Sequence, residues 1–327
     1  MFPKGADNRK NDRRLGLLKK VLVTGADGFL GRHLVKKLLS EGKDVFGIVC
    51  PDSKEFDDLN EDHLHIKKVD INEASQLEEL FPVGEIDVMY HFAWAGVKPE
   101  ERNDYDVQIK NVGMTMKCME LASLLKIKRI VFPGSCNEYL YYGKPLDRNA
   151  VASPFDAYGA VKIALKYLCA SYCEYNGIDF VYTILTGVYS ADRCDNNVIT
   201  YTVKKLLCKE KPIFTKLEQT WDYIYIDDAV EALFLVGEKG RKNAIYSIGH
   251  GDNWKLRKYI DIIHNAIDAS LPLGIGEIPY SDDRIPCVCI DLTDLQRDTG
   301  FVPRVDFENG IKKVIKTVKS DMGFDTE

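Results

Sequence analysis

Tyr158 and Lys162 are the residues of this 327-residue chain whose types and spacing most directly suggest chemistry. Both lie in a segment with helical periodicity, and side chains four residues apart stack on one face of a helix. A nearby ammonium favours the phenolate, which would lower the tyrosine pKa from about 10 toward the range where a general acid–base works. Because Tyr-x-x-x-Lys pairs also occur on ordinary helices, the pair alone is weak evidence for an active site.

Ser135 strengthens this evidence through its place in the chain. It follows an apolar strand predicted over Arg129–Phe132, and the carboxyl ends of strands in α/β sheets are where ligands bind. A hydroxyl there can hydrogen-bond a substrate oxygen as its charge changes. We therefore predict that Ser135, Tyr158 and Lys162 are the catalytic residues.

The segment Thr24–Gly31 (TGADGFLG) links a predicted strand, Lys20–Thr24, to a predicted helix, Phe29–Leu39. Such a turn presents free backbone N–H groups and the positive end of the helix dipole, which suit a pyrophosphate. The alternative is that Thr24–Gly31 is an ordinary flexible turn. The place of this segment after the first predicted strand favours a dinucleotide site. The residues predicted to contact the cofactor here are Gly25, Asp27, Gly28, Phe29, Leu30, Gly31 and Arg32.

The end of the second predicted strand, Val45–Val49, bears on the choice of cofactor. An acid at this point binds the ribose of NAD, whereas a nearby Arg accepts the 2′-phosphate of NADP. Here the expected acid position is apolar and Asp52 lies beyond a proline, while Arg32 could approach a phosphate. The pattern leans slightly toward NADP and leaves NAD open.

Strands separated by helical segments predict a Rossmann-type doubly wound parallel sheet, an α/β fold with helices on both faces. Beyond residue 185 the alternation of strands and helices becomes less regular, which predicts a smaller, mixed C-terminal lobe for the substrate. We predict a cofactor lobe over residues 19–185 with a return at 221–248, a substrate lobe over 186–220 and 249–327, and a flexible arm over 1–18.

Composition excludes several classes of protein. With 44 basic and 50 acidic residues the net charge is −6, so no basic excess indicates nucleic-acid binding. No uncharged apolar run approaches the ~20 residues that span a bilayer, and we expect no membrane association. The nine irregularly spaced cysteines, without a CxxC pair, indicate reduced thiols in a cytoplasmic protein and no metal site.

Taken in order along residues 19–315, these motifs resemble the extended short-chain dehydrogenase/reductases, specifically the NAD(P)-dependent sugar-nucleotide epimerase/dehydratase family. The matching segments are TGADGFLG, Asp70-Ile71, HFAWAG at His91–Gly96, Asn111, Ser135, Tyr158/Lys162 and YIYIDDAVEA at Tyr223–Ala232. The resemblance implies that Asp70 and Ile71 border the adenine, that Ala93 and Ala95 line the cofactor cleft, and that Asn111 belongs to the cofactor site. It also implies hydride transfer at a sugar carbon, usually C4, of a nucleoside-diphosphate sugar.

The chain departs from the family pattern where the substrate would bind. Cys136-Asn137 replaces the Asp-Glu pair of the 4,6-dehydratases, which disfavours dehydration, and Trp221 stands where an Arg is usual. Arg193, Lys204 and Arg284 are candidates to hold a diphosphate, the alternative being solvated surface charges. The full set of predicted substrate contacts is Trp94, Asn137, Arg193, Asn197, Lys204 and Arg284.

Two reactions fit these residues. A 4-epimerase would keep NAD bound and return the hydride to the other face of the sugar, whereas a 4-ketoreductase would exchange NADPH. A reductase of a non-sugar carbonyl and a non-catalytic NAD(P)-binding module are further alternatives. We also expect a homodimer, formed through the predicted helices Tyr105–Lys126 and Ala157–Tyr175.

Overall fold

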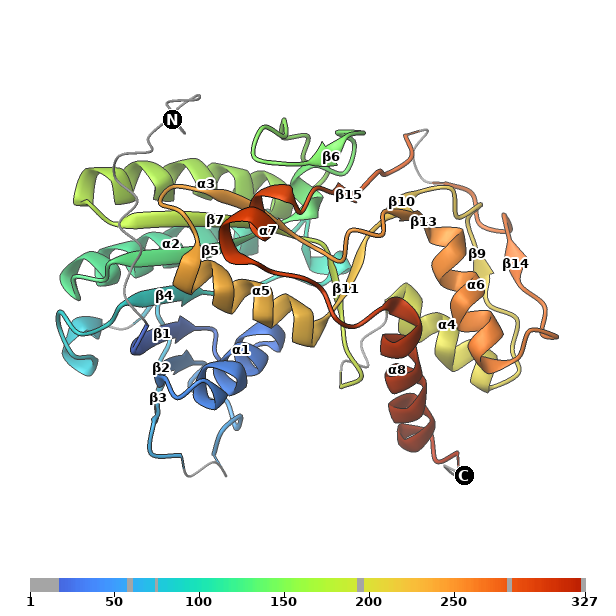
Figure 1. The fold of residues 1–327 in the computed structure, drawn as a ribbon, viewed down its shortest axis with the longest axis horizontal. Helices are drawn as coiled ribbons and strands as arrows, with labels where there is room; N and C mark the ends of the chain where they lie inside the picture. The colour runs from blue at the N-terminus through green and yellow to red at the C-terminus, as the bar shows by residue number, and fades with distance from the viewer. Residues whose placement is uncertain (1–17, 58–60, 74–75, 193–196, 281–283, 325–327) are drawn as a thin grey trace.

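A computed structural model (Figure 1) describes residues 18–57, 61–73, 76–192, 197–280 and 284–324. The arm predicted over residues 1–18 lies outside this range except for Leu18. That residue is only 2% exposed and belongs to the hydrophobic core.

The centre of the molecule is a seven-stranded sheet, in the order β12-β7-β5-β4-β1-β2-β3, in which every neighbouring pair is parallel. The strand order reverses between β1 and β4, and open α/β sheets bind ligands at such a switch point. This sheet confirms the predicted fold class. Its strands are β1 (Lys20–Thr24), β2 (Asp44–Val49), β3 (Leu64–Lys68), β4 (Val88–His91), β5 (Arg129–Ser135), β7 (Asp179–Leu185) and β12 (Ile245–Ile248).

Two pairs of helices cover this sheet. Helix α1 (Phe29–Ser40) packs against α5 (Ile226–Lys239), and α2 (Tyr105–Leu124) packs against α3 (Ala157–Asn176), so that the pairs lie on opposite faces (Figure 1). Val21, Leu22 and Val23 of β1 are therefore all fully buried, although their side chains point alternately to the two faces.

A second group of elements lies beyond the carboxyl edge of the sheet (Figure 1). Its helices α4 (Val198–Leu207), α6 (Leu256–Ile267) and α8 (Phe307–Asp321) pack against one another, and the Tyr259 and Phe307 rings meet edge to face at 4.8 Å. The accompanying two-stranded pairs are β8 (Gly187–Tyr189) with β11 (Tyr223–Tyr225), β9 (Ile213–Phe214) with β14 (Gly274–Ile275), and β10 (Thr220–Trp221) with β13 (Trp254–Lys255).

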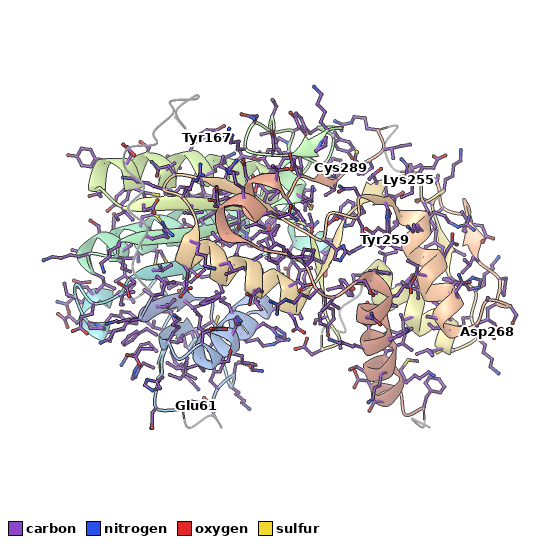
Figure 2. All side chains as sticks on the ribbon, viewed as in Figure 1. Glu61, Tyr167, Lys255, Tyr259, Asp268 and Cys289 are labelled. Atoms are coloured by element: carbon purple, nitrogen blue, oxygen red, sulfur yellow. The ribbon has the colours of Figure 1, made fainter. Side chains whose placement is uncertain are left out.

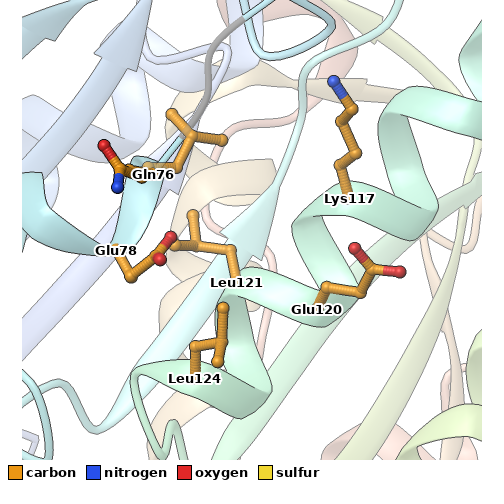
Figure 3. Close-up of a pocket in the computed structure, with 7 residues that line it drawn as sticks. Gln76, Glu78, Lys117, Glu120, Leu121 and Leu124 are labelled. Atoms are coloured by element: carbon orange, nitrogen blue, oxygen red, sulfur yellow. The ribbon is translucent and has the colours of Figure 1, made fainter.

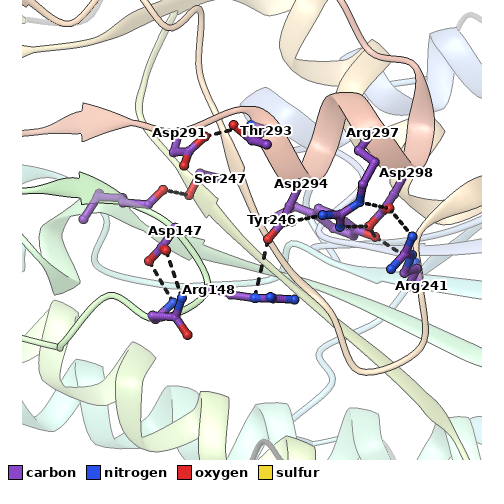
Figure 4. Close-up of polar contacts among 12 residues, drawn as sticks. Asp147, Arg148, Arg241, Tyr246, Ser247, Asp291, Thr293, Asp294, Arg297 and Asp298 are labelled. Atoms are coloured by element: carbon purple, nitrogen blue, oxygen red, sulfur yellow. Dashed lines mark hydrogen bonds and ion pairs between the residues drawn. The ribbon is translucent and has the colours of Figure 1, made fainter. Parts of the chain in front are cut away.

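Helix α7 (Thr293–Thr299) returns from this second group to the sheet, where it packs against α5 and β12. Asp298 fixes it there, because its carboxylate accepts a hydrogen bond from the Tyr246 hydroxyl at 3.0 Å and pairs with Arg241 at 2.9 Å (Figure 4). Nearby, β15 (Cys289–Ile290) pairs with β6 (Pro145–Leu146). Part of the segment predicted as a substrate lobe thus contacts the sheet, and the predicted division into two lobes stays a prediction.

Two short elements complete the description. Residues Leu77–Leu80 form a 3₁₀ turn, η1. Strands β10 and β11 are separated at Asp222, whose buried carboxylate accepts hydrogen bonds from the backbone N–H groups of His250 and Gly251. Within the described residues, no helix is both long and apolar enough to cross a membrane.

Candidate active site

The turn between β1 and α1 brings three chain segments into close contact. Gly25 has φ +65°, and a Cβ there would lie 2.6 Å from the Ala93 nitrogen; a Cβ on Gly31 would lie 2.1 Å from the Gly25 carbonyl oxygen. Neither position accepts a side chain without moving backbone. Gly28 is the N-cap of α1 and supplies no capping oxygen, and the first turn holds no acidic residue. This helix N-terminus therefore suits a phosphate.

Arg32, at the start of α1, has an acidic partner within the protein. Its Nη2 lies 3.0 Å from Oδ2 of Asp192, which also bonds Nε2 of His33 at 3.0 Å. Asp27 accepts a hydrogen bond from the Cys50 N–H at 3.2 Å, directly at the end of β2. The charge that Arg32 was expected to offer a phosphate is thus balanced by Asp192, which weakens one of the two reasons for the lean toward NADP.

The loop after β4, residues 92–96, is held by two buried amides of α2. Asn111 Nδ2 donates to the Ala95 carbonyl and its Oδ1 accepts from the Ala95 N–H, both at 2.9 Å. Gln108 Nε2 donates to the Gly96 carbonyl at 2.8 Å, and its Oε1 accepts from the Trp94 indole at 3.1 Å. Asn111 was predicted as a cofactor residue, and in this structure it positions the loop that contains Ala93 and Ala95.

Asp70, which was predicted to border the adenine, and His91 are two further polar residues at the carboxyl ends of β3 and β4. Asp70 accepts a hydrogen bond from the Asn72 N–H at 2.8 Å and so shapes the turn after β3, where Ile71 is buried. His91 bridges Thr24 at 2.7 Å and Thr115 at 3.0 Å. Burial, with a contribution from the charge of Lys162, lowers the pKa of His91 to about 3, so this histidine is neutral and joins β1, β4 and α2.

The three predicted catalytic residues, Ser135, Tyr158 and Lys162, are called the catalytic group below, and they converge at the carboxyl end of β5. Ser135 is the last residue of β5 and the N-cap of the short turn η3 (Cys136–Glu138). Tyr158 lies in the first turn of α3, whose N-cap Asp156 accepts from the Gly159 N–H at 2.7 Å. Lys162 follows one turn later and donates to the Pro133 carbonyl at 2.9 Å.

The electrostatics of this group differ from the expectation that Lys162 lowers the pKa of Tyr158. Burial and the negative charge of Glu138 raise the pKa of Tyr158, while a hydrogen bond with Ser135 and the charge of Arg102 oppose them. Burial lowers the pKa of Lys162 itself to about 7, so its charge is only partly available. The expectation is therefore wrong for this structure, because burial raises the pKa of Tyr158 and Lys162 is not among the groups that lower it.

Arg102 is a residue that sequence reasoning missed. Its guanidinium carbon lies 5.6 Å from the centre of the Tyr158 ring, and its carbonyl accepts a hydrogen bond from the Tyr158 N–H at 3.0 Å. It follows the turn η2 (Pro99–Glu101) and donates from Nε to the Val97 carbonyl. The motifs gave no signal for it, because the contact depends on how this turn folds against α3.

Trp94 also reaches the catalytic group. Its ring meets that of Tyr158 edge to face at 5.7 Å, and the Lys162 ammonium lies 3.6 Å from its centre. Both contacts place this predicted substrate residue beside the residues that would do chemistry. A direct contact between Trp94 and a substrate stays a prediction.

The other predicted substrate residues are spread over several elements. Asn137 is buried in η3, and Asn197 caps α4 by accepting from the Ile199 and Thr200 N–H groups. Lys204 lies on α4, Arg284 stacks 4.2 Å from the Tyr141 ring, and Arg193 lies outside the described residues. Their roles in substrate binding stay predictions.

The positions that would support dehydration hold no available acid. Burial raises the pKa of the Cys136 thiol to about 12, and Asn137 does not ionise. Glu138, the next residue, points into the core, where its Oε1 accepts hydrogen bonds from the Ser135 N–H and the Tyr182 hydroxyl. This geometry supports the sequence argument against elimination chemistry.

A surface pocket elsewhere in the molecule has no part in this site. It lies between η1 and the second half of α2 (Figure 3), and none of the predicted site residues lines it. Its lining residues are Gln76, Leu77, Glu78, Lys117, Glu120, Leu121 and Leu124.

Comparison with known proteins identifies the family to which the chain belongs. Residues 21–249 match the NAD dependent epimerase/dehydratase family. The chain is 25% identical over 317 residues to the UDP-glucose 4-epimerase of Mycolicibacterium smegmatis, covering 91% of this chain and 97% of that protein. It is likewise 25% identical over 305 residues to the CDP-abequose synthase of Salmonella muenchen, covering 92% and 98%.

A solved structure shows the same fold. The UDP-glucuronic acid 4-epimerase of Bacillus cereus, in complex with UDP-glucuronic acid and NAD, superimposes with a TM-score of 0.79 at 22% identity, covering 92% of this chain and 99% of that one. The family match spans more than half of the chain and includes the glycine turn, the catalytic group and the strands that hold them. The chain therefore belongs to the NAD-dependent epimerase/dehydratase family, which confirms the resemblance seen in its sequence.

Proposed function

We propose that this protein is a nucleoside-diphosphate-sugar 4-epimerase that uses NAD for hydride transfer at C4 of the sugar. The observation that supports this most directly is the convergence of Ser135, Tyr158 and Lys162 at the carboxyl end of β5. The matched family and the relatives named above support the same class of substrate.

The residues present fit a dinucleotide. Gly25 and Gly31 leave no room for side chains between β1, α1 and the loop after β4, so backbone N–H groups line the turn. Asn111 holds that loop in place through both polar atoms of its amide. NAD, when bound there, supplies the acceptor and donor of the hydride, and the protein supplies orientation and electrostatics.

The catalytic group would manage the proton at the sugar oxygen. Tyr158 would take the proton from the C4 hydroxyl as the carbon is oxidised and return it when the 4-keto sugar is reduced. Ser135, which hydrogen-bonds Tyr158, would donate to the same oxygen, and Lys162 would bind the nicotinamide ribose. Arg102 would favour the tyrosinate form, because its positive charge lies next to the ring.

We propose NAD rather than NADP as the cofactor. The matched family is described as NAD dependent, and the Arg32 guanidinium already pairs with Asp192. Calorimetric titration of the purified protein with each dinucleotide tests this. We expect NAD to bind at least tenfold more tightly than NADP, and tighter binding of NADP would overturn the assignment.

A 4-ketoreductase is the second candidate. It is favoured by the similarity to CDP-abequose synthase over 98% of that protein. Such an enzyme would reduce a 4-keto sugar made by a separate dehydratase, and it would consume one reduced cofactor for each product.

One experiment separates these reactions. The protein is incubated with NAD and, in turn, UDP-, dTDP-, GDP- and CDP-hexoses, and proton NMR follows the C4 configuration. A 4-epimerase gives two C4 epimers without net change in NADH absorbance, whereas a ketoreductase leaves hexoses unchanged and oxidises NAD(P)H only with a 4-keto-6-deoxy sugar nucleotide. Failure of both, in protein that binds NAD, would overturn the proposal.

We also propose which elements of the fold contact the dinucleotide and the sugar nucleotide. The sheet with α1, α2, α3 and α5 would bind the dinucleotide, and the group of α4, α6 and α8 would supply the other wall of the substrate site. Lys204 of α4 and Arg284 are the charged side chains proposed to reach the diphosphate.

A further inference from the structure

Ser135 is held from its backbone side by a buried carboxylate that the proposed reaction does not use. Oε1 of Glu138 accepts a hydrogen bond from the Ser135 N–H at 2.6 Å, and the Ser135 Oγ accepts one from the Asn137 N–H at 3.2 Å. These reciprocal bonds form a capping box at the start of η3. Together they fix both the backbone of Ser135 and the place of its Oγ.

The bond from Asn137 leaves the Ser135 hydroxyl able to donate. A serine hydroxyl has one O–H donor and two acceptor sites, and the Asn137 N–H occupies one acceptor site. The O–H is therefore available to a substrate oxygen at the carboxyl end of β5. Without the bond from Asn137, Oγ would be free to occupy the other staggered rotamers, which direct the donor elsewhere.

Tyr182 on β7 holds Glu138 from the opposite side. Its hydroxyl donates to the same Oε1 at 2.7 Å, and both residues are 0% exposed. The Tyr182 ring stacks on that of Phe132 in the neighbouring strand, with ring centres 5.8 Å apart. A Cβ on Gly134 would lie 2.2 Å from the Tyr182 hydroxyl, so a glycine at this position lets that hydroxyl approach β5. Two strands and a turn therefore fix the carboxylate.

The complete burial of Glu138 exceeds what a three-residue turn requires. An exposed Glu or Gln at the third position is enough to complete a capping box. Here the other carboxylate oxygen, Oε2, is buried and has no hydrogen-bond partner, which is unfavourable. Costs of this kind are typical of residues that support a functional group from behind.

We propose that Glu138 is a positioning residue that acts through Ser135: anchored by Tyr182, its carboxylate fixes the turn that presents the Ser135 hydroxyl to the C4 oxygen of the sugar. This inference rests on the proposed function, in which Ser135 donates to that oxygen. Glu138 itself touches neither cofactor nor substrate in this scheme.

Two substitutions of Glu138 separate its hydrogen bonds from its volume. Glu138→Leu fills similar space without an acceptor, whereas in Glu138→Gln the amide carbonyl still accepts from the Ser135 N–H and the Tyr182 hydroxyl. Thr183→Val is the control, because Thr183 is also a buried residue of β7 whose hydroxyl has no hydrogen-bond partner. Far-ultraviolet circular dichroism and thermal melting verify that each variant folds.

The anchoring of Ser135 is measured first, by amide hydrogen exchange of the full-length protein without added ligand. Serine labelled with ¹⁵N gives the NMR signal, which is assigned by its loss in Ser135→Ala. We expect exchange at Ser135 to accelerate about tenfold or more in Glu138→Leu and to stay within about threefold of wild type in Glu138→Gln. Ser247 on β12 is the internal reference and should not change.

Unchanged exchange at Ser135 in folded Glu138→Leu would overturn the inference, as would equal acceleration at Ser135 and Ser247, which would indicate general destabilisation. This measurement needs neither NAD nor turnover. It therefore tests the anchoring even if the proposed function fails.

The link to catalysis is tested by a double-mutant cycle with the hexose substrate that the NMR assay identifies. Glu138→Leu should lower kcat ~100-fold, as loss of a positioned donor does, and leave NAD affinity within about twofold of wild type. Glu138→Gln and Thr183→Val should retain most of the activity. In a Ser135→Ala background, Glu138→Leu should cost no more than about a further twofold, because the residue acts through Ser135.

Fully additive losses in this cycle would show that Glu138 acts independently of Ser135 and would overturn the inference. An equal loss of kcat in Glu138→Gln and Glu138→Leu would contradict it as well. Should Glu138→Leu not fold, Tyr182→Phe replaces it, since it removes only the donor behind the carboxylate. Its kcat should fall by a smaller factor, and that loss should disappear in the Ser135→Ala background; an unchanged kcat would overturn the inference.

Discussion

The ammonium of Lys162 lies 3.6 Å from the centre of the Trp94 ring, which makes the indole face its nearest aromatic partner among the described residues. Trp94 comes from the loop after β4 and Lys162 from α3, so the contact joins the cofactor side of the site to the catalytic group. A desolvated cation–π contact is worth about 1–2 kcal/mol and favours the charged form of the amine.

Trp94→Leu should therefore weaken NAD binding in a pH-dependent way. Removing the ring lowers the pKa of Lys162 further below about 7, because burial then acts with less opposition. NAD affinity should fall several-fold at ~pH 7.5 and return toward the wild-type value at ~pH 6, where the amine is protonated. Calorimetric titrations across this range measure it.

Trp94→Phe is the matched variant for this test. It keeps an aromatic face for Lys162 but loses the indole N–H that donates to Gln108. We expect its pH dependence to follow the wild-type protein. If both variants lose affinity equally at every pH, the hydrogen bond to Gln108 rather than the ring is the important contact.

Tyr158→Phe should abolish turnover and leave NAD affinity within about twofold of the wild-type value. The phenol is the group proposed to move the proton at O4, and proton transfer by a positioned side chain contributes ~100- to 10,000-fold to rate. The NMR assay for C4 epimers measures turnover, and calorimetry measures binding. A variant that retains a near-normal rate would exclude Tyr158 as the acid–base.

Gly25→Ala and Gly31→Ala should each eliminate dinucleotide binding. The added methyl would lie 2.6 Å from the Ala93 nitrogen or 2.1 Å from the Gly25 carbonyl oxygen, so backbone must move in the turn that holds the pyrophosphate. Gly113→Ala is the control, since nothing lies within 4 Å of a Cβ at that exposed helical position. The control should bind NAD normally and gain about 0.5–1 kcal/mol of stability.

Much of the fold could be predicted from the sequence because the sheet strands are continuous apolar runs. Such runs, separated by helical periodicity, leave few topologies open, and strand Lys20–Thr24 has the predicted bounds. Helices α7 and α8 were not predicted. Helix α8 carries a local signal that the prediction missed, since Asp306 is its N-cap and Ile311, Val314 and Val318 are buried at helical spacing. Helix α7 is stabilised by distant partners such as Tyr246, which no local signal shows.

The site was predictable to the extent that its residues stand in motifs. The order of glycine turn, Ser135 and Tyr158/Lys162 identified three chain segments that the fold brings together. Arg102 and Glu138 could not be recognised in the same way, because their roles depend on burial and on neighbours across the chain. The direction of the Tyr158 pKa shift was mispredicted for the same reason: spacing shows proximity but does not show desolvation.

Asn111→Leu should destabilise the protein and weaken NAD binding together. The substitution removes the two hydrogen bonds to the N–H and the carbonyl of Ala95, and each such hydrogen bond contributes about 0.5–1.5 kcal/mol. We expect a loss of about 2 kcal/mol in the free energy of unfolding, measured by urea denaturation. Asn149→Leu, at an exposed turn position, should change it by less than about 0.5 kcal/mol. Loss of stability with unchanged NAD affinity would show that the loop does not support the cofactor.

The exposed faces of α2 and α3 predict a homodimer in solution. Ile109 on α2 and Tyr167 and Leu168 on α3 are 62%, 51% and 48% exposed, and Tyr167 is labelled on the upper left of Figure 2. These two helices pack against each other, and exposed apolar side chains of this kind are what protein interfaces bury. A second copy of this chain is the proposed occupant.

Multi-angle light scattering tests the dimer, with a monomer mass of 37.1 kDa as reference. The wild-type protein should have about twice this mass, and the double variant Ile109→Glu/Tyr167→Glu should be monomeric, because burying an unpaired carboxylate in an interface is strongly unfavourable. Val302→Glu is the control: Val302 is 63% exposed but lies outside α2 and α3, so the variant should remain dimeric. A monomer mass for the wild-type protein at every concentration would exclude the interface.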